Sequence, residues 1–166
     1  MQPLSSPAQP AEAEAAFRCD VPVVGGGPAG STIAGLLAEK GRDVVVIEKA
    51  HHPRFHIGES LLPANVALFD RLGLRDRVEA IGIQKYGVEF VSPDHEHRQF
   101  IEFVEAWDKS MPYAWQVRRS QLDEILFRDA AAKGARTRPT PTGWSPTRRL
   151  APTFRIRPLI DGDAAA

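Results

Sequence analysis

Residues 25–30 have the sequence GGGPAG, in which three glycines follow the spacing G-x-G-x-x-G of turns that bind a dinucleotide pyrophosphate. We expect Gly25 to permit a sharp turn, Gly27 to let the backbone approach the phosphates, and Gly30 to let a helix pack closely on a strand. The N-terminus of that helix would offer unpaired N–H groups and a positive dipole end to an anion. Ser31 would add a hydroxyl donor. The alternative is a glycine-rich turn that only connects a strand to a helix.

Glu48 follows the glycines at a distance of about 20 residues, which is the usual separation between the phosphate turn and a ribose-binding carboxylate. An adenosine ribose can donate hydrogen bonds to such a carboxylate. A hydrogen bond to a charged acceptor contributes about 1.5–3 kcal/mol. The turn and Glu48 together predict a nucleotide site at one edge of a sheet.

The elements that position these residues follow from local patterns. We predict a strand over 20–24, a helix over 31–40 that ends at a left-handed Gly41, and a strand over 44–47. The last segment, VVVI, is typical of a parallel strand buried on both faces, so the opening is a β-α-β unit. Pro22 conflicts with this prediction because it lacks a ladder donor. Either the first strand begins after Pro22, or one hydrogen bond worth about 1 kcal/mol is lost.

Further along the chain we predict helices over 63–72 and 75–80, and strands over 87–92 and 99–104. The turn-forming residues 93–96 between these strands favour a hairpin. A strand over 113–117 then leads to a helix that Ser120 would cap and Gly134 would end.

The length of 166 residues predicts one domain, which we divide into a flexible extension (1–16), an ordered part (17–136) and an irregular tail rich in Pro and Arg (137–166). One short strand near 154–160 is the alternative within the tail. Lys+Arg and Asp+Glu are both 21, which argues against a nucleic-acid partner. No segment is apolar enough to span a membrane or resembles a signal peptide, and Cys19 stands alone, so we expect a cytoplasmic protein. The spacing of His51, His52 and His56 fits no usual metal site.

Several longer stretches resemble the flavin-dependent halogenases over residues 20–135. They are VVGGGPAGS at 23–31, PRFHIGESLLP at 53–63, KYGVEF at 85–90 and WQVRRSQLD at 115–123. The resemblance implies an α/β fold, namely a Rossmann-like FAD-binding β-α-β domain of the glutathione-reductase type with part of an added antiparallel sheet. It also implies that the domain is truncated, because the second flavin segment and the Trp-x-Trp-x-Ile-Pro motif of that family are not found in this sequence.

The resemblance assigns roles residue by residue. Lys85 matches the catalytic lysine, although a solvated lysine at a strand end is the alternative. The matched FAD-binding residues are Gly25, Gly27, Pro28, Ala29, Gly30, Ser31, Glu48, Lys49, Gly58, Glu59, Ser60 and Arg119.

The implied activity uses FAD as FADH2, with oxygen and halide, to halogenate a phenolic or pyrrolic substrate that is either free or tethered to a carrier protein. A separate flavin reductase would supply the FADH2. Two alternatives remain at this point: a related FAD-dependent aromatic hydroxylase, and a non-catalytic nucleotide-binding fragment.

Overall fold

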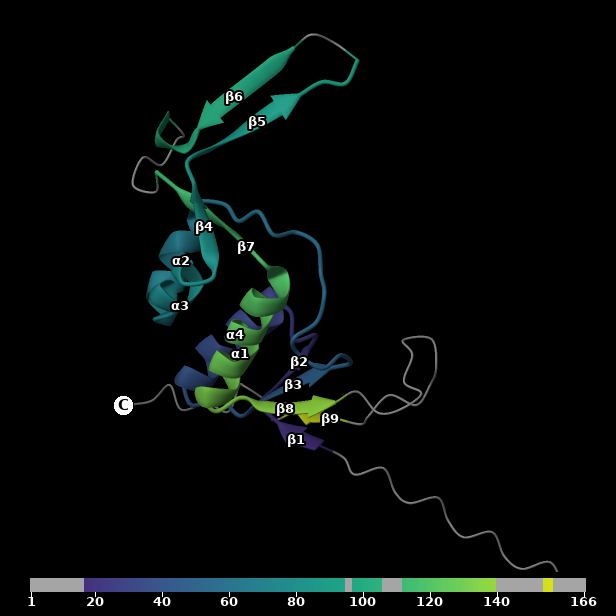
Figure 1. Ribbon diagram of the computed structural model, residues 1–166. Coiled ribbons are helices and arrows are strands. Elements are labelled where there is room, and N and C mark those ends of the chain that lie inside the picture. The colour runs from purple at the N-terminus through teal and green to yellow at the C-terminus, as the bar shows by residue number, and fades with distance from the viewer. Residues whose placement is uncertain (1–16, 95–96, 106–111, 140–153, 157–166) are drawn as a thin grey trace, which may run out of the picture.

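The computed structural model describes residues 17–94, 97–105, 112–139 and 154–156. The predictions for the extension at 1–16 and for most of the tail lie outside these residues. The described part is elongated, with a parallel sheet at one end and a projecting hairpin at the other (Figure 1). Two helices, α1 and α4, lie side by side between them.

The parallel sheet has the order β2-β3-β8, formed by Val21–Val24, Val44–Glu48 and Arg136–Pro139. Helix α1 (Pro28–Glu39) connects the first two strands, so the predicted β-α-β unit is confirmed. The helix is followed by Gly41 at φ +74°, in the predicted left-handed conformation. Strand β8 was not predicted, and the boundary that we expected after residue 136 falls inside it.

Strand β3 is buried along its whole length, as its sequence predicted. Val44 and Val46 pack among residues of α1 and α4, whereas Val45 and Ile47 pack against Cys19 on the other face. Cys19 belongs to β1 (Phe17–Cys19), which pairs in parallel with β9 (Phe154–Ile156). Both faces of β3 are therefore covered, which explains its unbroken β-branched sequence.

Pro22 lies inside β2, opposite Val45, and causes no loss of pairing. The N–H groups of Val21 and Gly25 donate to carbonyl oxygens in and beside β3, at 3.1 and 2.8 Å. Because backbone donors alternate in direction along a strand, the nitrogen of Pro22 faces away from β3. Because β2 is an edge strand of this sheet, no described strand of the sheet lies on that side. The missing N–H of Pro22 therefore breaks no hydrogen bond of the sheet.

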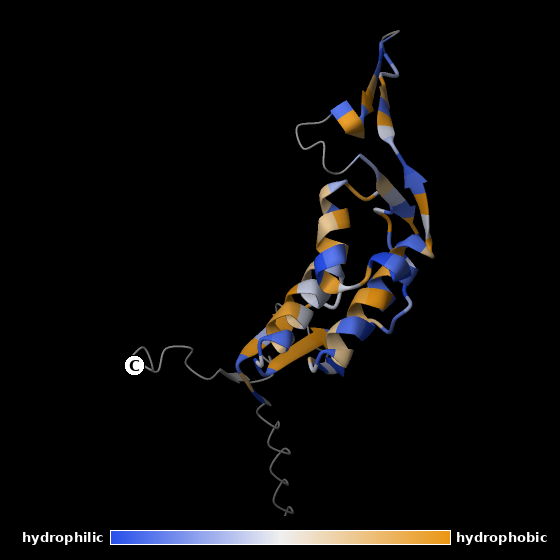
Figure 2. Ribbon diagram, turned by 90° about the vertical axis from the view of Figure 1, so that its left-hand side faces the viewer, coloured by the Kyte–Doolittle hydropathy of each residue, from blue (hydrophilic) through white to orange (hydrophobic). Residues whose placement is uncertain are grey.

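A second core joins α2 (Ala64–Leu72), α3 (Arg75–Glu79), β7 (Ala114–Val117) and α4 (Arg119–Ala132), with Trp115 at its centre. Strand β4 (Gly82–Lys85) pairs antiparallel with β7. The predicted hairpin is confirmed as β5 (Gly87–Val91) and β6 (Arg98–Glu102), followed by the short helix η1 (Phe103–Glu105). Figure 2 shows hydrophobic and hydrophilic residues mixed along this projecting hairpin.

The predicted cap of α4 is wrong. The helix begins at Arg119, so Ser120 lies in its first turn, and Arg118 at the N-cap makes no side-chain cap bond. Arg119 lies inside the helix, where its guanidinium reaches Asp123, four residues later on the same face. No helix in the described ranges is both long and apolar enough to cross a bilayer.

Candidate functional site

The backbone geometry explains the need for glycine at two of the three motif positions, Gly25 and Gly30. Gly25 has φ +97°, a conformation that side chains disfavour. A Cβ on Gly30 would lie 1.9 Å from the carbonyl oxygen of Gly25, so only glycine permits this approach of helix to turn. A Cβ on Gly27 would contact only the Arg54 guanidinium, at 3.5 Å. The Arg54 side chain therefore faces Gly27 at an ordinary contact distance.

Gly26 was treated as a variable position of the motif, yet the structure constrains it as well. A Cβ there would lie 2.7 Å from two ring atoms of Phe127 and 3.2 Å from the Cβ of Glu48. Its N–H donates to Oε2 of Glu48 at 2.6 Å. This contact fastens the turn to the end of β3.

Helix α1 begins directly after the turn, with Gly27 as N-cap and Pro28 in the first helical position. Within the described part of the chain no side chain caps its N-terminus, and no acidic residue lies in its first turn. The Ser31 hydroxyl, which we expected to face a phosphate, donates instead to the carbonyl oxygen of Gly26 at 3.0 Å. Ser31 therefore holds the turn in shape while the backbone N–H groups stay available for an anion.

Glu48 is 7% exposed, and each of its two carboxylate oxygens accepts a hydrogen bond from a backbone N–H group. Oε2 accepts from Gly26 and Oε1 accepts from the N–H of Ala50 at 2.8 Å. Burial raises the pKa of this carboxyl, but the two amide donors and the cation of Arg54 outweigh burial and hold the pKa below its usual value. Glu48 is thus an anion at neutral pH, and it lies at the end of β3 beside the glycine turn.

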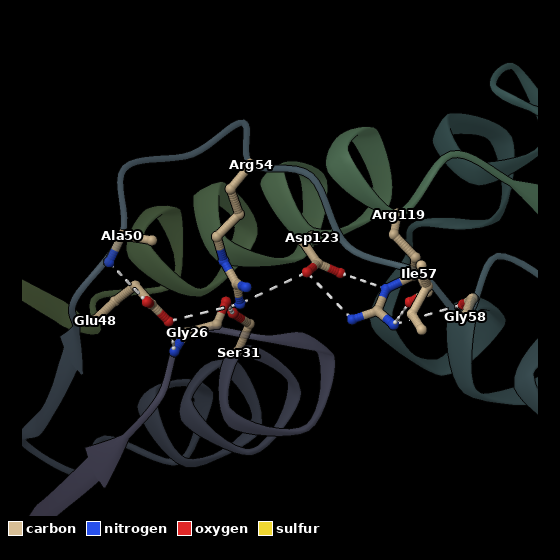
Figure 3. A network of polar contacts seen from close by, with 9 residues as sticks. All are labelled: Gly26, Ser31, Glu48, Ala50, Arg54, Ile57, Gly58, Arg119 and Asp123. Atoms are coloured by element: carbon tan, nitrogen blue, oxygen red, sulfur yellow. Dashed lines mark hydrogen bonds and ion pairs between the residues drawn. The ribbon is translucent and has the colours of Figure 1, made fainter.

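Arg54 lies beside the glycine turn and was not among the predicted site residues. Its Nη2 lies 3.7 Å from Glu48 and 3.7 Å from Asp123, while its buried Nε has no partner in the described part of the chain (Figure 3). Two anions therefore hold a guanidinium above Gly27 without using all of its donors. The sequence feature that could have indicated Arg54 as a site residue is the Pro-Arg pair at the start of the halogenase-like stretch at 53–63.

Asp123 is the second residue that sequence reasoning passed over. It is fully buried on α4 and accepts from Nε and Nη2 of Arg119 at 2.9 and 3.2 Å. Nη1 of Arg119 donates to the carbonyl oxygen of Ile57 at 3.0 Å. Gly58, the next residue, has φ +89°, and a Cβ there would lie 3.2 Å from Nη1 of Arg119. Asp123 thereby links the glycine turn to the Gly58 segment, as Figure 3 shows.

The segment beyond Gly58 lies along the free edge of β7. The N–H of Val117 donates to the carbonyl oxygen of Glu59, and the N–H of Leu61 donates to that of Trp115. Ser60 lies between these bonds, opposite Gln116. Its hydroxyl accepts a hydrogen bond from the Lys85 ammonium. The residue matched to catalysis therefore touches a residue matched to flavin binding.

Two pockets lie beside the glycine turn and the polar network of Glu48, Arg54, Asp123 and Arg119. One, of about 330 Å³, is lined by Glu48, Lys49, His52, Phe127 and Arg138 among others. The other, of about 440 Å³, is mostly apolar and is lined by Pro28, Ala29, Gly58, Arg119 and side chains of α1, α2 and α4. All predicted FAD-binding residues except Glu59 and Ser60 therefore lie in the turn, in the polar network or in one of these pockets. Glu59 lies apart, in another pocket, of about 480 Å³, which Arg118 and Gln121 also line.

His52 packs beside the turn without making a polar contact. Its ring lies 4.6 Å from that of Phe127, and neither ring nitrogen has a hydrogen-bond partner among the described residues. Burial lowers the pKa of His52 from its ordinary value of 6.5, and Arg54 lowers it further, against the opposing pull of Glu48, Asp123 and Glu124. The fold therefore favours the neutral imidazole.

We predict that the His52→Phe variant is more stable than the parent, by about 1–3 kcal/mol, because it removes two buried polar atoms without partners. The parent should also lose stability as the pH falls below about 6.5, since the unfolded chain then binds a proton more readily than the folded chain. Urea unfolding at pH 7.5 and 5.5 measures both effects. Equal stability of the two proteins at both pH values would contradict the prediction.

Comparison with known proteins agrees with this geometry. The sequence model of a family described as "FAD binding domain" matches residues 18–141. The chain is 44% identical over 119 residues to the flavin-dependent halogenase gsfI of Penicillium aethiopicum, and covers 22% of that protein and 72% of itself. It is 45% identical over 116 residues to a tryptophan 2-halogenase of Chondromyces crocatus, covering 69% of itself and 21% of that protein.

Among solved structures, the myxobacterial chondrochloren halogenase CndH is similar, with a TM-score of 0.67 and 36% identity. The match covers 74% of this chain and 28% of that structure. The chain thus spans about a fifth of the length of the curated relatives that it matches.

Proposed function

Since this chain belongs to the FAD-binding domain family and is similar to flavin-dependent halogenases, we propose that its site residues hold an extended FAD molecule. These residues run in space from Glu48, past the glycine turn, to Gly58, Arg119 and Ser60. The pyrophosphate would lie against Gly27 and the N-terminus of α1. The adenosine would lie toward Glu48 and Lys49, and the flavin toward Gly58 and Arg119.

The arrangement of groups around Gly27 carries this proposal. A pyrophosphate needs close access to the backbone, unpaired N–H groups and compensation of its charge. The absence of a side chain at Gly27, the start of α1, which no described side chain caps, and the Arg54 guanidinium provide these three conditions at one point. A turn that served only as a connection would not require a partly buried arginine beside it.

The two pockets fit the two ends of the molecule. The pocket at Glu48 and Lys49 lies where the carboxyl ends of β3 and β8 meet, which is the usual place for a nucleotide on a parallel sheet. The pocket at Pro28, Gly58 and Arg119 has an apolar lining suited to a ring system. We place the isoalloxazine end there.

Titration of the purified chain with FAD and with ADP, followed by flavin fluorescence and calorimetry, tests this assignment. We expect both ligands to saturate, and the Arg54→Gln variant to bind each of them about 10- to 100-fold more weakly, since it loses a charge-assisted contact of about 1.5–3 kcal/mol. Arg98→Gln is the matched control, because Arg98 lies on the projecting hairpin and is 74% exposed. No saturation, or equal weakening by both variants, would refute the site.

We further propose that the protein to which these residues belong uses FADH2, oxygen and halide to halogenate an aromatic substrate. Bound FADH2 would supply the electrons for making a hypohalous oxidant, and a separate flavin reductase would regenerate the FADH2. We assign the catalytic role to Lys85, because its ammonium can donate a hydrogen bond to hypohalous acid and polarise it toward an electron-rich ring. A phenolic or pyrrolic ring, free or on a carrier protein, and a cytoplasmic location complete the proposal.

A hydroxylase would use the same turn and Arg119, so the halide decides between the two activities. With FADH2, oxygen and a phenol, we expect a halogenated product only when bromide or chloride is added. We also expect at least 100-fold less of it from Lys85→Ala. A hydroxylated product without halide would favour the hydroxylase. FAD binding without any product would favour the non-catalytic nucleotide-binding fragment.

A further inference from the structure

Lys85 and Ser60 meet across a strand that separates them. Lys85 lies at the end of β4, opposite Ala114 of β7. Ser60 lies at the other edge of β7, opposite Gln116. Because Ala114 and Gln116 are two residues apart on one strand, all four residues share one face. The lysine therefore reaches over Ala114 to the far edge of β7.

The small side chain of Ala114 makes this crossing possible. Ala114 is fully buried, whereas Gln116 and Ser60 are exposed and Lys85 is half-buried. A larger residue opposite Lys85 would occupy the path of its methylene chain. The aliphatic part of Lys85 thus covers an apolar surface while its ammonium continues to the polar edge.

Two groups contact the Lys85 ammonium at the far edge of β7. The Ser60 hydroxyl accepts its hydrogen bond, and the Phe103 ring has its centroid 5.6 Å from Nζ. A cation at this distance from an aromatic face is attracted by the ring. Burial lowers the pKa of Lys85, and no carboxylate in the described ranges forms an ion pair with it.

We infer that Ser60 is a positioning residue for Lys85, and that its hydroxyl keeps the ammonium above Phe103 instead of extended into water. The contact between Ser60 and Lys85 does not depend on the proposed function. Only its importance for catalysis rests on the role proposed for Lys85. The resemblance had assigned Ser60 to flavin binding alone. Without the hydroxyl, a partly desolvated ammonium has no hydrogen-bond acceptor among the described residues at this place, and extension into solvent becomes more favourable.

The test measures the lysine directly, without FAD, halide or turnover. Trace labelling of the folded chain with acetic anhydride over a pH series, read for each lysine by mass spectrometry, gives the pH midpoint of reactivity. Lys40, an exposed residue after α1, serves as reference within the same molecule. In the parent we expect the midpoint for Lys85 to lie below that for Lys40.

In Ser60→Ala the Lys85 midpoint should rise to that of Lys40, and Ser60→Thr, which keeps a hydroxyl, should restore the parent profile. Circular dichroism confirms that each variant is folded. A midpoint that stays or falls in Ser60→Ala, or profiles for Lys85 and Lys40 that already coincide in the parent, would overturn the inference. These results do not depend on halogenation, so a failure of the proposed activity remains distinguishable from a failure of this contact.

Discussion

Replacing Gly30 with alanine is expected to remove the folded state at ordinary temperature. The new Cβ would lie 1.9 Å from the Gly25 oxygen and 3.1 Å from the Gly25 carbonyl carbon, and both are backbone atoms that no rotamer change can move. Relief requires separation of α1 from the turn, which also breaks the packing of α1 on β3. We expect a loss of at least about 4 kcal/mol, at the upper end of single substitutions.

Gly35→Ala is the matched control in the same helix. Its Cβ would meet Ala130 and Lys133 only at 3.5 Å or more, in ordinary contact, and alanine favours a helix over glycine by about 0.5–1 kcal/mol. Urea unfolding should therefore show Gly35→Ala as stable as the parent or more so. A Gly30→Ala protein with parent-like stability would show that the close approach of helix and turn is not obligatory.

Gly27→Ala separates ligand access from folding. Its Cβ would touch only the Arg54 side chain, so we expect the parent's unfolding midpoint together with loss of FAD binding. Retained FAD affinity in this variant would remove the pyrophosphate from the place assigned to it.

Loss of the Asp123 carboxylate has the second largest expected effect. Asp123 is fully buried and pairs with Arg119 through two hydrogen bonds, while Arg54 lies at 3.7 Å from it. Asp123→Ala would leave two mostly buried guanidinium groups without this anion. Removing one partner of a buried ion pair costs about 3–5 kcal/mol, and we expect Asp123→Ala to lose about 3 kcal/mol.

The effect on ligand binding should exceed the effect on folding at moderate temperature. Without Asp123, nothing on α4 holds Arg119 against Gly58 or Arg54 over the turn. We expect the remaining folded protein to bind FAD at least 100-fold more weakly. Fluorescence titration at 10 °C, beside a urea unfolding curve, measures the two quantities separately.

Glu124→Gln provides the comparison on the same helix. Glu124 forms an ion pair with Arg128, which is 71% exposed, and such pairs contribute about 0.3–0.5 kcal/mol. We expect unchanged FAD affinity for it. If Asp123→Ala behaved like Glu124→Gln, the buried network would have no role in holding the site.

Local patterns in the sequence determined the elements nearest the site. The spacing of Gly25, Gly27 and Gly30, followed by a β-branched run, predicted a β-α-β unit, and the structure contains it. Such patterns suffice because they depend on backbone conformation and on side-chain periods of 2 and 3.6 within a few residues. The helix end at Gly41 was predicted for the same reason, since a left-handed residue stops a helix locally.

The start of α4 shows where local reasoning failed. Ser120 has the chemistry of a cap, but the helix begins at Arg119, where the guanidinium can join Asp123 and the carbonyl of Ile57. Strand β8 was missed because its pairing with β3 is a contact between segments about ninety residues apart. The pairing of β8 is thus wholly long-range, whereas Arg119 at the start of α4 combines a contact within the helix with a long-range one to Ile57.

Only the tertiary structure decided how the site residues meet. The sequence contained Arg54, Asp123, Ser60 and Lys85, but not the two ion pairs of Arg54 or the reach of Lys85 across β7. Those contacts depend on strand register and on the angle between packed helices, to which residues far along the chain contribute. The sequence by itself thus determined which groups could bind a nucleotide, whereas long-range packing determined which of their atoms remain free to do so.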